Sequence, residues 1–301
     1  MVMKVLGIGE SVVDNAYIGE HKHAVKHVGG PSLIALILLA RLGIDCTLLT
    51  TLGRDDEAEI IRKTVKHEQV RMIARLQKKT KVNNYTINPL DGSRQKQRGD
   101  VVHPFIKNLD RNFVRQFDVI IIDRHERIAF YEILKKKKPT TKIIIDPSTE
   151  VSSFTLDMIQ YAEYPIIPIE SLTKIGNGRD LSVCLQTLHK VTKKPVIITA
   201  GELGSIIYDG KIIDVIPTLQ IQAVDVQGAG DIYRGAFAYG ILQGWGNKKC
   251  AQYANNVAAL QCMRLGNAAA IPTKDEIDLL GNAFVEKEVT IPIMTQYFAQ
   301  L

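Results

Sequence analysis

Short runs of branched apolar residues alternate with longer helical segments along most of the chain, and this rhythm constrains the fold more than any other feature. Several of the runs are apolar throughout, as strands are when both faces of a sheet are covered. The rhythm predicts an α/β fold with a mostly parallel central sheet. The predicted strands are KVLGIG (4–9), CTLLTTLG (46–53), FDVIIID (117–123), TKIIID (141–146), YPIIPI (164–169) and KPVIITAG (194–201). Helices are predicted near 31–42, 55–68, 125–137, 153–162, 179–192, 229–243, 247–264 and 274–286.

Four stretches depart from this rhythm. The segment SIIYDGKIIDVIP (205–217) has Asp-Gly between two apolar runs, which predicts a hairpin and an antiparallel edge of the sheet. Residues 11–30 and 80–104 alternate over short spans and contain polar turns, which indicates small antiparallel strands inserted into the α/β body. The C-terminal VTIPIMTQYFAQL is short and apolar, and it is compatible with an edge strand or with packing on a neighbouring element.

The composition excludes several classes of protein. With 46% hydrophobic and 23% charged residues, the 301-residue chain is typical of globular proteins. The net charge of +6 favours anionic ligands, but nucleic-acid-binding patterns are missing, so we expect no nucleic acid partner. The four cysteines are scattered, which fits a cytoplasmic protein and predicts neither a zinc site nor disulfides. The longest apolar run, residues 33–40, is too short to span a bilayer, and the N-terminus lacks a signal-peptide pattern, so we expect no membrane association.

The segment VDVQGAGD carries the clearest chemistry. Three small residues, Gly228, Ala229 and Gly230, precede a helix that is predicted to begin near Asp231. A helix N-terminus offers unpaired backbone N–H groups, and small residues allow a phosphate to approach them. Asp231 would then stand at the mouth of an anion site. An aspartate in this place is also a favoured helix cap, and the segment alone leaves both interpretations open.

Four segments in the same order resemble the ribokinase-like, or PfkB-type, carbohydrate kinases. DVQGAGDIYRGAF is similar to the family pattern DTxGAGDxFxGAF, and GGPSLIALILLARLG is similar to GGPxxNxAxxLARLG. IITAGELGSIIYDG resembles the family's glycine-containing hairpin, and YANNVAALQCMRLGNAAAIPT resembles its closing helix on the ATP side. The resemblance spans nearly the whole chain. It implies a three-layer α/β sandwich with a small β lid, and an ATP-dependent transfer of phosphate to a hydroxyl of a sugar-like substrate.

The resemblance also implies a division into a core and a lid. We predict an α/β kinase core made of residues 1–10, 31–79 and 105–301. Residues 11–30 and 80–104 would form the β lid over the substrate site. Relatives often pair through such lids, so a homodimer through the lid is possible, although one chain does not decide it.

The family's catalytic roles carry over to matching positions. Asp231 would be the catalytic base, and Gly228, Ala229 and Gly230 would form the anion hole for the transferring phosphoryl group. This division suits the reaction, because the phosphoryl transition state is loose and the protein mainly positions groups and stabilises charge. The carboxylate would orient the hydroxyl and accept its proton late.

Substrate and nucleotide contacts carry over in the same way. Asp14, Gly29 and Gly30 would bind substrate, and Arg94 matches a lid arginine that reaches substrate in some relatives. Asp14 can instead be a turn residue, and Arg94 and nearby Arg98 can be surface charges. ATP would lie against the C-terminal half of the chain, with Mg²⁺ neutralising its phosphates, and no metal ligand is predicted. The matching nucleotide positions are Thr199, Gly201, Gly204 and Asn255, of which Asn255 can also be a polar residue on an exposed helix face.

Three departures from the family pattern bear on substrate and activity. Ile34 replaces the asparagine of GGPxxN, which removes a polar substrate contact. Ile169 and Leu172 stand where the family has Asn-x-x-Glu, with Glu170 as the only acidic residue there, and Val226 replaces the threonine of DTxGAGD. The ketohexokinase and sulfofructose-kinase branch also lacks Asn-x-x-Glu, and the segments around residues 119–134 resemble that branch. The resemblance therefore favours a ketose or a related sugar, while reduced activity is the alternative.

Arg234 follows Asp231 by three residues, on roughly the same helix face. Three interpretations are open. Arg234 would bind phosphate, or it would pair with Asp231 and weaken that residue as a base, or it would face solvent.

The sequence thus predicts an ATP-dependent sugar kinase. A nucleoside kinase on the same scaffold and a catalytically weakened sugar- or nucleotide-binding homologue remain as alternatives. A dinucleotide-dependent oxidoreductase is disfavoured, because Val12 occupies the third glycine position of the fingerprint after the first strand.

Overall fold

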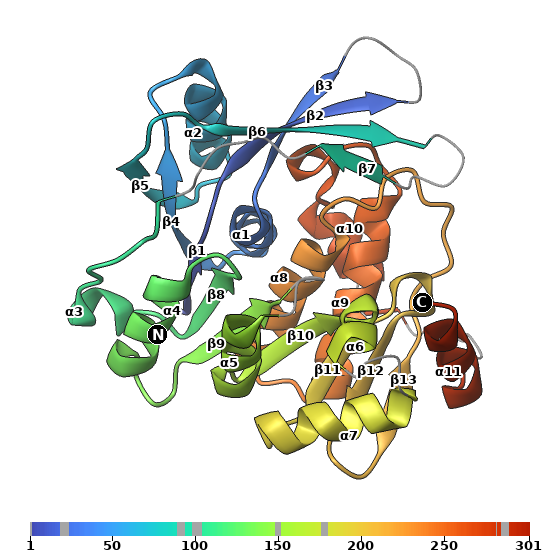
Figure 1. The fold of residues 1–301 in the computed structure, drawn as a ribbon. Helices are drawn as coiled ribbons and strands as arrows, with labels where there is room; N and C mark the ends of the chain where they lie inside the picture. The colour runs from blue at the N-terminus through green and yellow to red at the C-terminus, as the bar shows by residue number, and fades with distance from the viewer. Residues whose placement is uncertain are drawn as a thin grey trace.

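The protein contains two β-sheets with helices packed around the larger one (Figure 1). In the computed structural model, residues 2–18, 24–88, 94–97, 104–147, 152–175, 180–280, 282–283 and 289–301 are described. Arg98 and the side chain of Arg94 lie outside the described part.

The larger sheet has nine strands in the order β13-β12-β11-β10-β9-β8-β1-β4-β5. Neighbours are parallel except that β12 runs antiparallel to both β11 and β13, which confirms the hairpin and the antiparallel edge. All six predicted strands are present, whereas β5 was not predicted. The strands are β1 (Lys4–Ile8), β4 (Asp45–Leu52), β5 (Arg71–Leu76), β8 (Val119–Asp123), β9 (Lys142–Asp146), β10 (Tyr164–Pro168), β11 (Val196–Thr199), β12 (Ser205–Tyr208) and β13 (Ile213–Ile216).

Strand β1 is the point at which the order of the sheet reverses. It pairs in parallel with β4 on one side and with β8 on the other. From β1 the chain first builds outward through β4 and β5, and it later continues in the opposite direction from β8. Crossovers that leave in opposite directions open a crevice at the carboxyl ends of the two central strands, which is where α/β sheets bind ligands. Glu10 and Asp123 lie at these ends.

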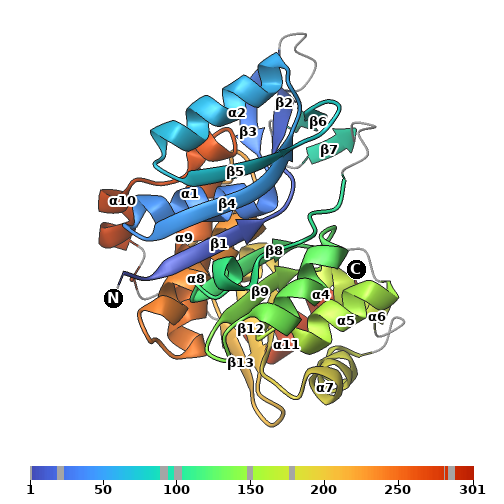
Figure 2. The same ribbon diagram turned by 90° about the vertical axis from the view of Figure 1, so that its left-hand side faces the viewer.

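Helices cover both faces of the larger sheet (Figure 2). One face carries α1 (Pro31–Arg41), α2 (Asp56–His67), α8 (Ala229–Leu242), α9 (Asn247–Cys262) and α10 (Lys274–Leu280). The other carries α3 (Arg111–Val114), α4 (Arg127–Lys136), α5 (Ser153–Tyr161), α6 (Ile169–Ile175), α7 (Leu181–Thr192) and α11 (Ile291–Ala299). The three-layer α/β sandwich is thereby confirmed. Within the described ranges, every helix is too short or too polar to cross a membrane.

The C-terminal stretch, whose fold the sequence left open, forms helix α11. Its Met294 and Phe298 are buried in the same apolar cluster as residues of α6 and α7. The stretch therefore packs on the core and adds no edge strand.

The smaller sheet has four strands in the order β3-β2-β6-β7 and lies over the larger sheet near α1 and α10 (Figure 1). Its strands are β2 (Val12–Ile18), β3 (Val25–Gly29), β6 (Lys81–Ile87) and β7 (Arg94–Gln97), all within the two stretches predicted to form the lid. The outer pairs are antiparallel as expected, but β2 and β6 are parallel. The exact boundary between core and lid stays a prediction.

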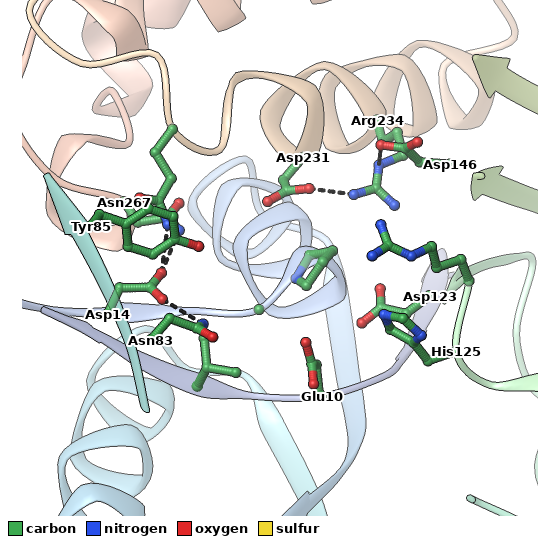
Figure 3. Close-up of a pocket in the computed structure, with 15 residues that line it drawn as sticks. Glu10, Asp14, Asn83, Tyr85, Asp123, His125, Asp146, Asp231, Arg234 and Asn267 are labelled. Carbon is green, nitrogen blue, oxygen red and sulfur yellow. Dashed lines mark hydrogen bonds and ion pairs between the residues drawn. The ribbon is translucent and has the colours of Figure 1, made fainter. Parts of the chain in front are cut away.

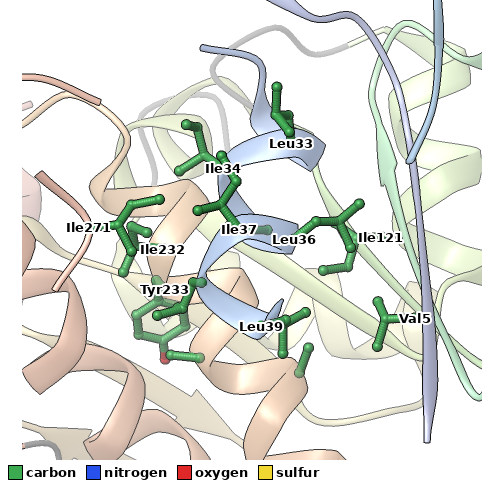
Figure 4. Packing of buried hydrophobic residues seen from close by; sticks show 14 of the residues in the cluster. Val5, Leu33, Ile34, Leu36, Ile37, Leu39, Ile121, Ile232, Tyr233 and Ile271 are labelled. Carbon is green, nitrogen blue, oxygen red and sulfur yellow. The ribbon is translucent and has the colours of Figure 1, made fainter. Parts of the chain in front are cut away.

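Helix α1 forms the centre of the core on its face of the sheet. It is apolar nearly all round, and Ser32 to Leu39 are all buried. Figure 4 shows Ile34 on this helix among buried apolar neighbours that include Ile232 and Ile271. A helix surrounded by apolar side chains in this way is fixed between the sheet and α8.

We predict that Leu36→Ala lowers the free energy of unfolding by about 2–5 kcal/mol, because it leaves a cavity where the helix meets β1. Leu36 is fully buried, and a Cβ on Gly7 would lie only 2.6 Å from its Cδ1. Urea denaturation measures the change. Leu279→Ala in α10, where the leucine is 77% exposed, is the control and should change the free energy by no more than about 0.5 kcal/mol. Equal losses in the two variants would contradict the assigned core.

Candidate active site

Two cavities lie on either side of the first turn of α8. The first, of about 210 Å³, is lined by Glu10, Val12, Asp14, Gly30, Pro31, Asn83, Tyr85, Asp123, Arg124, His125, Asp146, Gln227, Asp231, Arg234 and Asn267. The second, of about 420 Å³, is lined by residues of the β11–β12 connection, the segment 218–226, α8 and α9. Ala229 and Gly230 line the second cavity, and Asp231 lines the first. The first turn of α8 is therefore the wall between them.

Gly228 gives this turn its shape. It is the N-cap of α8 with φ of 79°, a left-handed conformation that glycine adopts without strain. A Cβ at this position would also lie 2.3 Å from Asn267 Oδ1. No side chain caps the helix, so Asp231 is a first-turn residue and its interpretation as the cap is wrong. An uncapped N-terminus leaves backbone N–H groups available for an anion.

Arg234 does not face solvent, which corrects one of the three interpretations of this residue. Its side chain is 2% exposed and forms an ion pair with Asp231. Its Nε donates to the carbonyl oxygen of Gly230 at 3.4 Å and lies 3.9 Å from Asp146 Oδ2. Nη1 is buried and has no hydrogen-bond partner among the residues that the structure describes. Burial raises the pKa of Asp231, while the charge of Arg234 opposes the rise.

Asp14 lies at the other end of the first cavity, inside a set of side-chain amides (Figure 3). Asn83 Nδ2 donates to its Oδ1 at 2.9 Å, and Gln227 Nε2 donates to its Oδ2 at 2.6 Å. Asn267 Nδ2 lies 3.5 Å from the same Oδ2. Because an ionised carboxylate only accepts hydrogen bonds, each amide must turn its NH₂ toward Asp14. The three amide oxygens are left buried without partners.

The two glycines of the predicted substrate turn lie close to this end. A Cβ on Gly29 would be 2.3 Å from Asp14 Oδ2, so only glycine allows the carboxylate its place. Gly30 has φ of 122° and lines the first cavity. The positions predicted for substrate binding in the sequence are thus brought together, except for Arg94, whose side chain lies outside the described part.

Asp123 is a further carboxylate at the crevice, at the carboxyl end of β8. Ser32 Oγ donates to its Oδ1 at 2.6 Å, and its buried Oδ2 has no hydrogen-bond partner. A Cβ on Gly9 would lie 1.8 Å from that oxygen, so the glycine after β1 makes room for it. Burial raises the pKa of Asp123 to about 7, against the opposing charge of Arg234 and the hydrogen bond from Ser32.

The predicted nucleotide positions gather around the second cavity. Thr199, Gly201, Gly204 and Asn255 all line it. Asn255 is 4% exposed, and its Nδ2 donates to Ile216 O at 2.9 Å and to Pro217 O at 3.1 Å. Its interpretation as a polar residue on an exposed helix face is therefore wrong. It joins α9 to the chain that follows β13.

The departures from the family pattern mostly lie away from the cavities. Ile34, Ile169 and Leu172 are completely buried in the apolar core and line neither cavity. Val226 is 44% exposed and lines the second cavity. The three buried positions therefore contribute packing and do not contact either cavity.

Sequence reasoning missed several cavity residues. Asp123 and Asp146 end two adjacent parallel strands, and the tendency of ligands to bind at carboxyl ends of strands would have indicated them. Asn83 and Asn267 carry no such signal, because only the folded chain brings β6 and the loop after α9 to Asp14. Further polar residues that were missed are Glu10, Tyr85, Arg124, His125 and Gln227. Among the described residues, no three His, Cys, Asp or Glu side chains are placed to hold a metal ion.

The family described as pfkB family carbohydrate kinase matches residues 112–274, more than half of the chain. This chain belongs to the pfkB family of carbohydrate kinases. Carbohydrate kinases of this family are phosphotransferases that use ATP and an alcohol group as acceptor. The match contains the first turn of α8 and the wall between the two cavities.

Curated relatives support the assignment. A ribokinase of Lactococcus lactis is 27% identical over 143 residues, which cover 47% of this chain and 45% of the relative. A sugar kinase of Pyrococcus horikoshii is 25% identical over 297 residues, which cover 91% of this chain and 94% of the relative. The chain thus spans less than half of the first relative and nearly all of the second.

Solved structures share the fold. A ribokinase of Thermotoga maritima superposes with a TM-score of 0.78 at 20% identity, covering 93% of this chain and 99% of its own. An adenosine kinase of Sinorhizobium meliloti superposes with a TM-score of 0.76 at 18% identity, covering 90% and 98%. The ribokinase-like fold is confirmed, and these identities are too low to transfer a substrate.

We predict that Asp123→Asn stabilises the protein increasingly as pH rises from 4 to 7. The folded protein holds a proton on Asp123 up to about pH 7, whereas the ordinary pKa is 3.8. Between these values the folded state binds more protons, so wild-type stability falls with rising pH. The fall is at most roughly 1.4 kcal/mol per pH unit.

Urea denaturation of both proteins from pH 4 to 8 measures the effect. The difference in unfolding free energy should grow up to about pH 7 and then level off. Asp275→Asn, at an exposed first-turn position of α10, is the matched control measured over the same range. A constant difference for Asp123→Asn would contradict the raised pKa.

Proposed function

We propose that this pfkB-family kinase binds a small polyhydroxylated, sugar-like acceptor in the first cavity and ATP in the second. The observation that carries the proposal is the position of Asp231 and the uncapped first turn of α8 between the two cavities. A phosphoryl group in transfer has to pass between donor and acceptor, and these groups lie on the wall that it would cross.

The chemistry of the first cavity favours an acceptor rich in hydrogen-bond donors. At the Asp14 end, the cavity is lined by one carboxylate and by the side-chain amides of Asn83, Gln227 and Asn267, whose buried oxygens have no hydrogen-bond partner within the described residues. Buried acceptors without partners are costly unless a ligand supplies donors. Adjacent hydroxyl groups of a sugar supply them. A cavity volume of about 210 Å³ suits a small acceptor of monosaccharide size.

The second cavity suits a nucleotide. It is twice as large as the first and is lined partly by apolar groups, among them Leu219, Ile221 and Ala258. The base would pack between the segment 218–226 and α9. The phosphates would extend toward Gly228, Ala229 and Gly230, where the small residues and the helix N-terminus favour negative charge. Thr199, Gly201, Gly204 and Asn255 would shape the nucleotide site.

In the proposed reaction, Asp231 orients the acceptor hydroxyl and takes its proton as the new P–O bond forms. The bond between the γ-phosphorus and the bridging oxygen of ADP breaks at the same time, and ADP leaves with the electron pair. The N–H groups of the α8 turn neutralise the equatorial oxygens. Mg²⁺ would travel with the ATP phosphates and neutralise their charge, and we assign it no protein ligand.

Several finer assignments remain hypotheses within this proposal. A nucleoside acceptor is the alternative to a sugar, and the shared fold with an adenosine kinase favours keeping it. A ketose acceptor, suggested by the branch resemblance of the sequence, has no further support from the relatives. The intact Asp231 and glycine turn favour an active kinase over a weakened binding homologue. A homodimer through the lid, which the family resemblance leaves open, also stays a hypothesis.

We predict that Asp231→Asn reduces kcat by roughly 10²- to 10⁴-fold, the range expected for loss of a general base. The measurement is ADP release with a panel of aldoses, ketoses and nucleosides. Asp275→Asn serves as the control, since it changes the same residue type in the first turn of another helix, at an exposed position. A variant at 231 that folds and keeps wild-type turnover would refute the assignment of the base.

We predict that Ala258→Phe raises KM for ATP by about tenfold or more, because the ring occupies part of the second cavity. KM for the acceptor should change by less than about twofold. Ala299→Phe, at an exposed position of α11, is the control and should leave both constants unchanged. A selective rise in KM for the acceptor would show that the two cavities had been assigned the wrong way round.

A further inference from the structure

Arg234 is the buried cation closest to Asp231, and it is surrounded by carboxylates from three elements. Asp231 comes from its own helix, Asp146 from the end of β9 and Asp123 from the end of β8. Arg124 and His125 line the same cavity from the loop after β8, Glu10 lines it from the segment after β1, and Asp14 lines it from β2. Figure 3 shows Arg234 between Asp231 and Asp146, on the side of the cavity opposite Asp14.

The surroundings of Asp231 work against its use as a base. Burial raises its pKa most, and the negative charges of Asp146 and Asp14 raise it further. A higher pKa leaves less of the carboxylate form, which is the form that accepts a proton from an alcohol. Of the groups that act most strongly on Asp231, Arg234 alone lowers the pKa, through its charge and its hydrogen bond. The availability of the base therefore depends on this guanidinium.

The geometry fixes the guanidinium in place. Arg234 lies three residues after Asp231, a spacing that sets both side chains on one helix face. Nε is directed at the Gly230 carbonyl and at Asp146, while Nη2 is bonded to Asp231. At 2% exposure the side chain has no solvent-facing alternative. It differs in this from an exposed ion pair, which water and salt would screen.

We propose that Arg234 is a positioning residue that keeps the Asp231 carboxylate ionised and directed into the first cavity. The inference rests on the proposed function, in which Asp231 is the base. Arg234 itself touches neither the hydroxyl nor the phosphoryl group in this account. Its charge is shared among several carboxylates, and it lowers the proton affinity of Asp231 as one of them.

Because several carboxylates share the charge of Arg234, two substitutions should shift the pKa of Asp231 in opposite directions. Arg234→Gln removes the positive charge and leaves Asp231 beside Asp146, so the pKa of Asp231 should rise. Asp146→Asn removes a negative neighbour and leaves Arg234 more fully to Asp231, so the pKa should fall. Arg234→Lys keeps a charge, although without the planar fork of the guanidinium, and it should restore most of the wild-type value.

The direct test is a pH titration of the Asp231 carboxyl ¹³C resonance in protein labelled at aspartate, without any ligand. The resonance is assigned by its absence in Asp231→Asn. We expect the midpoint to rise by about one pH unit or more in Arg234→Gln, to fall in Asp146→Asn, and to return toward wild type in Arg234→Lys. If Arg234→Gln does not fold, Arg234→Met is titrated in its place. Asp146→Asn still tests whether the midpoint of Asp231 moves in the expected direction.

The pH profile of kcat gives a second readout with the best acceptor of the panel. The acid limb should move to higher pH in Arg234→Gln by the same amount as the titration midpoint. An unchanged midpoint, or a uniform loss of kcat at every pH, would overturn the role of Arg234. Failure of the base assignment is distinguishable, because Asp231→Asn would then keep its turnover whatever the titration shows.

Discussion

The first turn of α8 is the feature on which the site depends, because it forms the wall between the two cavities. Gly228 makes the turn possible through its left-handed backbone, and the missing side-chain cap leaves the helix N-terminus available. The buried pair of α1 and α8 holds that end in position, since both helices belong to one apolar cluster. The crevice at β1 and β8 supplies the space in front of it.

Charge is distributed unevenly around the first cavity. The Asp14 end combines one carboxylate with side-chain amides, while the Asp231 end mixes three carboxylates with the buried Arg234. Each carboxylate of the cavity therefore has different surroundings. Amide donors surround Asp14, a guanidinium pairs with Asp231, and burial raises the pKa of Asp123 to about 7. One pocket can thus hold a hydroxylated molecule at one end and accept a proton at the other.

The sequence predicted the fold well wherever the signal was local. Apolar runs gave six strands of the large sheet, and Asp209-Gly210 gave the hairpin of β12 and β13. Asp231 and the glycine turn were predicted from a resemblance and are brought together at the cavity wall. Side-chain direction was not predictable in the same way: Arg234 and Asn255 each sit on helices where a polar residue can face water or the core, and both are buried. Asn83 and Asn267 reach Asp14 only through contacts between distant segments.

The account is tested most directly by a crystal structure with a non-hydrolysable ATP analogue and a turned-over acceptor bound together. We expect the γ-phosphate oxygens to lie within hydrogen-bond distance of the N–H groups at Ala229 and Gly230. One acceptor hydroxyl should lie about 3 Å from the Asp231 carboxylate and in line with the γ-phosphorus. A nucleotide bound away from the second cavity, or an acceptor whose hydroxyls all lie far from Asp231, would contradict it.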